Sequence, residues 1–136
     1  MKRTPMNKLK TLLLGVIGFS LFCIAAPALA HHSWTAEYDG KKPVTVKGTV
    51  TKVEWTNPHT HYYIESKDEA GTVTTWNFEM ASVLALERAG WTRKTLQIGD
   101  QVTIAGFGGK VVTTKAVASS ITSADGKALF DGKLGQ

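Results

Sequence analysis

The sequence predicts a small, mainly β barrel with a single helix. Two observations support this prediction. Five segments have the residue types or the alternation of apolar and polar side chains that are typical of strands, and one segment between the third and the fourth has helical character. The first strand also contains a shift in its apolar phase, which predicts a bend of the kind that a strand needs when it pairs on two sides of a closing sheet.

The first strand is predicted from Val44 onward. Val44, Val46 and Val50 occupy even positions and alternate with polar residues, whereas Trp55 lies on an odd position. A bulge near residues 51–52 would reconcile the two phases, so we expect this strand to be long and bent.

The later elements follow from turn and helix signals. An Asn-Pro step ends the first strand, a Gly-containing turn separates the second and third strands, and Gly90 is a natural end for the helix. Strands are expected over residues 59–66, 72–79, 101–107 and 111–123, with a helix over 80–89 and a short apolar segment at 128–130.

The order of three strands, one helix and two strands is that of an OB-fold, a five-stranded, partly open Greek-key barrel. A small sandwich and an SH3-like barrel are the alternatives. We therefore divide the chain into a signal peptide (1–30), an N-terminal arm (31–42) and an OB-like β-barrel domain (43–136).

Residues 1–30 have the properties of a secretory signal peptide. A basic segment without acidic residues precedes an apolar run from Leu12 to Ala26, and Pro27 and the pattern Ala28-Leu29-Ala30 follow. The run is shorter than the roughly 20 apolar residues of a membrane span, which disfavours the alternative of an uncleaved anchor. We expect a periplasmic or secreted protein with no stable membrane anchor after cleavage.

Cleavage changes the charge and the cysteine content. Four of the 16 basic residues and none of the 11 acidic ones precede the cut, so the net charge falls from +5 to +1. A nearly neutral chain argues against nucleic acid as a partner. The single cysteine, Cys23, is also removed, so the mature protein has no disulfide, and its 106 residues suit one domain.

The four histidines form two pairs, and cleavage after Ala30 would make His31 the first residue. Its amine, with a reference pKa of about 7.7–8.0, and its ring could chelate a metal as a histidine brace. Alternatively, His32 could bind together with the amine and the intervening amide. Nitrogen ligands in square geometry favour copper(II), whereas zinc is possible with a tetrahedral set.

The second pair is His59 and His61, which would point to one face if both lay on a strand, together with Tyr63. We expect this pair to be a further set of metal ligands, able to share one ion. In the alternative interpretation, His59 hydrogen-bonds the turn after Asn57-Pro58 and His61 lies on a solvated face.

Other chemistry has weaker support in the sequence. The aromatic residues could form a stacking platform of the kind found on some OB-folds, but we expect most of them in the core. No hydrolase, P-loop or metalloprotease motif is found, and Glu79 and Glu87 are expected to be ordinary surface carboxylates. We therefore predict that the protein is not an enzyme. The aromatic residues concerned are Trp34, Trp55, Tyr62, Tyr63, Trp76 and Phe78.

Several segments resemble a family of small exported bacterial proteins of unknown function. They are the mature start His31-His32-Ser33, Gly48-Thr49-Val50, Trp55-Thr56-Asn57-Pro58-His59, Ala89-Gly90-Trp91-Thr92-Arg93 and Gly99-Asp100. The resemblance spans nearly the whole mature chain and implies an exported, single-domain, OB-like barrel without an assigned activity. Of the second histidine pair, it extends only to His59.

The sequence thus leads to a periplasmic carrier or buffer for a metal ion, most favourably copper, with His31, His32, His59 and His61 as candidate ligands. A periplasmic partner protein would be served by such a carrier. The main alternative is an interaction module without a metal, and a copper redox enzyme ranks below both because 106 residues offer no separate substrate surface.

Overall fold

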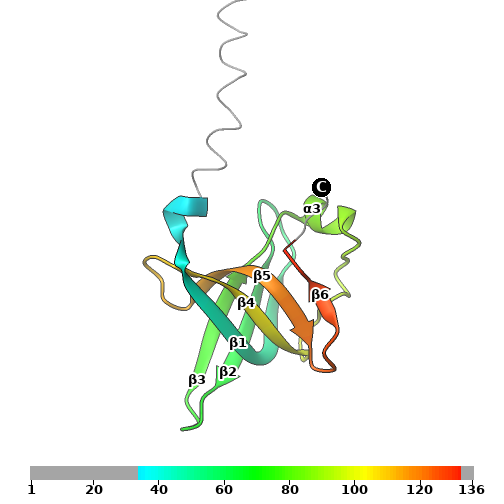
Figure 1. Ribbon diagram of the computed structural model, residues 1–136. Coiled ribbons are helices and arrows are strands. Elements are labelled where there is room, and N and C mark those ends of the chain that lie inside the picture. The colour runs from blue at the N-terminus through cyan, green and yellow to red at the C-terminus, as the bar shows by residue number, and fades with distance from the viewer. Residues whose placement is uncertain (1–33, 133–136) are drawn as a thin grey trace, which may run out of the picture. The chain divides into compact units, whose positions relative to one another are not determined.

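The computed structural model describes residues 34–132 (Figure 1). By its contacts, the described chain from Glu37 onward forms one compact unit, and every labelled element lies within it. The elements are β1 (Tyr38–Glu54), β2 (His61–Lys67), β3 (Val73–Glu79), α3 (Val83–Arg88), β4 (Gln101–Gly109), β5 (Lys115–Ser123) and β6 (Ala128–Phe130).

The strands form one sheet that closes on itself. Their order is β3-β2-β1-β4-β5-β6, and β3 pairs with β5 in parallel at Asn77, Phe78 and Glu79. Five strands therefore complete a ring, and the short β6 extends it along β5. With a helix between β3 and β4, this is the predicted OB-fold-like barrel, so the prediction of the fold class is confirmed.

The bend in β1 lies where the phase shift predicts it. β1 pairs with β4 up to Thr49 and with β2 from Thr49 onward, and the register with β2 shifts between Val50 and Lys52. Gly48 permits the close approach of β2 at this corner, because a Cβ atom there would stand 2.1 Å from the backbone oxygen of Glu65.

β1 begins at Tyr38, so residues 38–42 of the expected N-terminal arm belong to the first strand of the barrel. The polar residues that follow Tyr38 hide this strand in the sequence, but the Tyr38 side chain is buried and its backbone pairs with Gly109. The rest of the expected arm before Trp34, including His31 and His32, lies outside the described residues.

Three other boundaries differ from expectation. β2 begins at His61, so His59 lies in the preceding loop and does not share a strand with it. The helix covers only Val83–Arg88, and β5 begins at Lys115 because the residues after Gly109 form a longer loop than predicted. Each shift involves residues next to a turn, where the alternating pattern carries the least information.

The short helix is fixed at its start by two side chains. The Ser82 side chain accepts a hydrogen bond from the Ala85 backbone N–H, and the Asn57 side chain accepts one from that of Val83. Leu86 is fully buried and anchors the helix to the core. The loop that carries Asn57 and His59 is thereby attached to the helix.

Aromatic side chains make up much of the core, as expected. The ring of Trp91 packs edge-on against Tyr62 and Phe130, with centroid distances of 6.2 and 6.0 Å. The buried hydrophobic cluster comprises Val46, Val50, Trp55, Tyr62, Ile64, Phe78, Met80, Leu86, Trp91, Leu96, Val102, Ile104, Ala116, Ile121 and Phe130.

Candidate functional site

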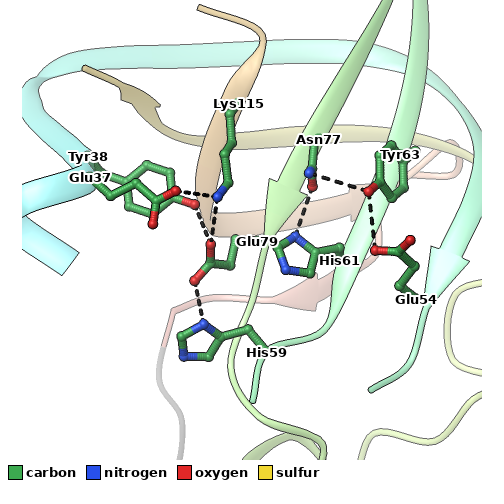
Figure 2. Close-up of polar contacts among 9 residues, drawn as sticks. All are labelled: Glu37, Tyr38, Glu54, His59, His61, Tyr63, Asn77, Glu79 and Lys115. Carbon is green, nitrogen blue, oxygen red and sulfur yellow. Dashed lines mark hydrogen bonds and ion pairs between the residues drawn. The ribbon is translucent and has the colours of Figure 1, made fainter. Parts of the chain in front are cut away.

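The most concentrated polar chemistry among the described residues surrounds Glu79, the last residue of β3 (Figure 2). Its carboxylate is almost fully buried, with a side chain that is 10% exposed. Oε1 lies 2.6 Å from Nδ1 of His59, and Oε2 accepts a hydrogen bond from the Tyr38 hydroxyl and lies 3.4 Å from Nζ of Lys115. Lys115 also pairs with Glu37, and we call these five residues the Glu79 cluster.

Barrel closure brings the Glu79 cluster together. Tyr38 begins β1, Lys115 begins β5, and the parallel pairing of β5 with β3 places Lys115 opposite Asn77, two residues before Glu79. His59 comes from the loop before β2, which is held by hydrogen bonds between the backbones of Thr60 and its neighbours on the β3 side. Four separate segments therefore supply one site.

The electrostatics of the cluster keep Glu79 ionised. Burial alone would raise the pKa of the Glu79 carboxyl, but the hydrogen bond from Tyr38 and the attraction of His59 and Lys115 outweigh burial and lower that pKa below its ordinary value. Conversely, burial and the adjacent Glu79 carboxylate raise the pKa of the Tyr38 hydroxyl, which stays protonated and donates. Burial would lower the pKa of Lys115, but its pairing with Glu37 and Glu79 raises it.

His61 belongs to a second hydrogen-bonded chain, formed with Asn77, Tyr63 and Glu54 (Figure 2). Nδ1 of His61 lies 2.9 Å from Oδ1 of Asn77, the Asn77 amide nitrogen lies 3.5 Å from the Tyr63 hydroxyl, and that hydroxyl lies 3.2 Å from Oε2 of Glu54. We call this set the His61 chain.

The carboxylate at the end of the His61 chain sets the direction of its hydrogen bonds. An ionised carboxylate only accepts, so the Tyr63 hydroxyl donates to Glu54 and accepts from the amide group of Asn77. The carbonyl oxygen of Asn77 then faces His61, whose Nδ1 must donate. Pairing with Lys52, together with the hydrogen bond from Tyr63, outweighs burial and lowers the pKa of Glu54, which keeps it in the accepting form.

Both described histidines therefore carry their hydrogen on Nδ1. For His59 the acceptor is the Glu79 carboxylate, and for His61 it is the Asn77 carbonyl. A ring that carries its single hydrogen on Nδ1 keeps the lone pair on Nε2, and the His59 side chain is 46% exposed. This arrangement can bind a metal ion at Nε2.

His59 and His61 both contact side chains of β3, although His59 does not lie on β2. His59 contacts Glu79 and His61 contacts Asn77, and these two β3 residues are two apart and so share one face of the strand. Within residues 34–132, no three histidine, cysteine or acidic side chains are grouped so as to hold a metal ion. His31 and His32, the other predicted ligands, lie outside the described residues.

Glu79 is the residue that sequence reasoning missed. We expected an ordinary surface carboxylate, and this was wrong, because Glu79 is buried beneath Tyr38 and Lys115. A signal was present in the sequence, since Glu79 stands between the apolar residues Phe78 and Met80 at the end of a strand. An acidic residue in such surroundings is buried only when it has partners.

Most of the aromatic residues named above lie in or against the core, whereas Trp34 is exposed. Trp55, Tyr62 and Phe78 are buried in the core, and Trp76 is partly buried and stacks on Phe78 at 6.0 Å. Tyr63 faces outward, but its hydroxyl donates to Glu54, and Nζ of Lys52 lies 4.6 Å from its ring centroid.

Among residues 34–132, no helix has the length and hydropathy to cross a membrane.

Comparison with known proteins identifies a family. Residues 19–118 match the model of a "Family of unknown function (DUF6152)". No curated protein matches the chain. Among solved structures, two crystal forms of the mitochondrial single-stranded DNA binding protein Rim1 from S. cerevisiae are similar, with 14% and 18% identity and TM-scores of 0.46 and 0.45. The matches cover 67% and 68% of this chain and 96% and 97% of those chains.

Proposed function

Because the chain belongs to DUF6152, a family of unknown function, we propose a function from its own geometry: the protein is a metal-binding carrier or buffer, most favourably for copper, in which Nε2 of His59 and Nε2 of His61 are two of the ligands. The observation that carries this proposal is that each ring donates Nδ1–H to an oxygen acceptor.

Such outer hydrogen bonds are a general property of histidines that bind metals. A carboxylate or carbonyl behind Nδ1 selects the tautomer with a free Nε2, orients the ring and makes the nitrogen a stronger donor to the metal. In His59 the acceptor is a buried carboxylate, which also stabilises the positive charge of a bound cation. A histidine on a merely solvated face needs no such partner.

Two imidazoles do not complete the coordination of copper(II) or zinc. The remaining ligands must come from outside residues 34–132, and the sequence offers the amine and ring of His31 after cleavage, and His32. Nitrogen ligands alone favour copper(II), and zinc would be accepted in a tetrahedral set. Carriage rather than catalysis fits a periplasmic protein of this size with no enzymatic motif.

The decisive experiment uses protein recovered from the exported fraction, with intact mass establishing that it begins at His31. Copper(II) affinity is measured by competition with a chelator, and nitrogen ligation by electron paramagnetic resonance. We expect submicromolar affinity and about a tenfold or larger loss in His59→Ala and in His61→Ala. Glu65→Ala, which removes an exposed side chain from β2, the strand of His61, is the matched control and should leave the copper affinity unchanged.

A variant with one extra residue ahead of His31 tests the contribution of the terminus. We expect its affinity to fall, because the amine is then no longer part of the chelate. Micromolar or weaker affinity that is unchanged by this extension would overturn the proposal. The alternative, an interaction module without a metal, would then be favoured by binding to a periplasmic partner that survives both a strong chelator and His31→Ala.

A further inference from the structure

The barrel has a groove whose lining residues include neither His59 nor His61. Its volume is about 420 Å³, which falls in the range of small-molecule sites. Two buried side chains, Trp55 and Leu96, contribute to its wall, and Ile98 is largely exposed at its border. The full set of lining residues is Val53, Trp55, Arg93, Leu96, Gln97 and Ile98.

The groove brings together two residues that the copper proposal does not use, Trp55 and Arg93. Trp55 comes from the Trp-Thr-Asn-Pro-His segment after β1, and Arg93 comes from the Gly-Trp-Thr-Arg segment after α3. Nothing in the local sequence connects them, since they are separated by two strands and the helix. The barrel places both on one wall.

The backbone around the groove is held in place. The Trp91 N–H donates to the carbonyl of Leu86, and the Val50 N–H and carbonyl bond the carbonyl of Asp100 and the N–H of Gly99. Asp100 is the acidic residue of the segment that follows Arg93, and its carboxylate accepts a hydrogen bond from the Gln97 N–H. The groove is therefore formed before any ligand arrives, which lowers the entropic cost of binding.

The side chain of Arg93 indicates which class of ligand the groove would bind. Arg93 is exposed, and among residues 34–132 it has neither an ion pair nor a hydrogen bond to its side chain. A guanidinium beside an apolar wall offers a planar set of donors that matches a carboxylate with two parallel hydrogen bonds. Arg93 is the single basic residue in the lining, so the groove matches a ligand with one negative charge.

We propose that this groove binds a small amphipathic monocarboxylate. The carboxylate would pair with the Arg93 guanidinium, and the aliphatic tail would lie against Trp55, Leu96 and Ile98. Burial of the tail would remove apolar surface from water, which favours binding, and the paired charge determines which end of the ligand lies at Arg93. The site is independent of the proposed copper function.

The test uses decanoate, below its micelle concentration, with the exported protein and isothermal titration calorimetry. Decanol serves as the uncharged probe and acetate as the probe without a tail. We expect decanoate to bind more tightly than either, and Arg93→Gln to weaken decanoate by about tenfold or more while leaving decanol unchanged. Arg93→Lys should retain part of the affinity, because it keeps the charge but loses the paired hydrogen bonds.

Two controls make the result specific. Arg88→Gln removes an exposed arginine that does not line the groove and should leave decanoate binding unchanged. His59→Ala should also leave it unchanged, so failure of the copper proposal and failure of this one are separately visible. The proposal is overturned if decanoate does not bind, if Arg93→Gln binds it equally well, or if Arg88→Gln weakens it as much. Ile98→Ser, at the exposed border, should weaken decanoate and decanol alike.

Discussion

Nδ1 of His59 lies 2.6 Å from Oε1 of Glu79, a carboxylate that the fold has almost completely removed from water. A buried carboxylate is stable only when donors satisfy it, and here Tyr38, Lys115 and His59 all do so. His59 thus has one nitrogen committed to the interior of the site and the other available to an ion. This relationship connects the stability of the barrel to its proposed function.

Replacing Glu79 tests that connection. We expect Glu79→Gln to lower copper(II) affinity by about 10–100-fold, because loss of the carboxylate weakens the orientation of His59 and the basicity of its ring. Glu87→Gln, which alters an exposed carboxylate on α3, is the control and should bind copper as the unaltered protein does. Equal affinity in the two variants would show that Glu79 does not support a ligand. Chelator competition provides the measurement.

The pKa of Glu79 predicts how stability depends on pH. Its pKa is lower in the folded protein than its ordinary value of 4.5, so the unfolded chain binds a proton more readily. The carboxylate therefore contributes stability that is complete above about pH 4.5 and is lost as the pH falls through the folded value. Urea denaturation of the unaltered protein and of Glu79→Gln across this range should show a smaller acid-induced loss in the variant. Parallel curves would contradict this prediction.

Removal of the hydroxyl should change the free energy of unfolding differently at Tyr38 and at Tyr62. Tyr38 donates to the Glu79 carboxylate, so Tyr38→Phe should cost about 1.5–3 kcal/mol of unfolding free energy near neutral pH. The Tyr62 hydroxyl is buried without a hydrogen-bond partner among the described residues, so Tyr62→Phe should be neutral or stabilising. Denaturant titration of both variants checks the contrast, and a large destabilisation by Tyr62→Phe would reveal an unseen partner of that hydroxyl.

Two glycines should be required where the barrel strands approach each other most closely. A Cβ atom at Gly48 would stand 2.1 Å from the Glu65 oxygen, and one at Gly106 would stand 1.9 Å from the Val117 oxygen. Because both obstacles are backbone atoms, each Gly→Ala substitution should cost about 3 kcal/mol or more. Gly40→Ala, also in β1, has no atom within 4 Å of the new Cβ and should be nearly neutral. Thermal unfolding that shows comparable losses at all three positions would contradict the packing argument.

The attachment of the His59 loop to α3 can be tested separately. Asn57→Ala removes the acceptor for the Val83 N–H and should cost about 1 kcal/mol of unfolding free energy. Ser82→Ala removes the bond to the Ala85 N–H at a similar cost, but Ser82 is not on the His59 loop. We therefore expect Asn57→Ala to reduce copper affinity more than Ser82→Ala does. Equal effects on affinity would separate the loop from the metal proposal.

The bend in the first strand and the position of the helix between β3 and β4 could be predicted because their signals are local. The phase shift between Val50 and Val53 is visible within one strand, and the register shift lies inside that interval. The true start of β1 at Tyr38 could not be predicted, because the residues after Tyr38 are polar and only pairing with β4 makes them a strand.

The sequence by itself determined the order of the elements, the core aromatics and the histidines available as ligands, because periodicity and residue type are properties of neighbouring positions. Only the tertiary structure decided that Tyr38, His59 and Lys115 converge on Glu79, and that Trp55 and Arg93 share one groove. The physical reason is barrel closure. Parallel pairing of β3 with β5 and the long reach of β1 bring distant polar groups together, and their mutual hydrogen bonds then allow a carboxylate to be buried.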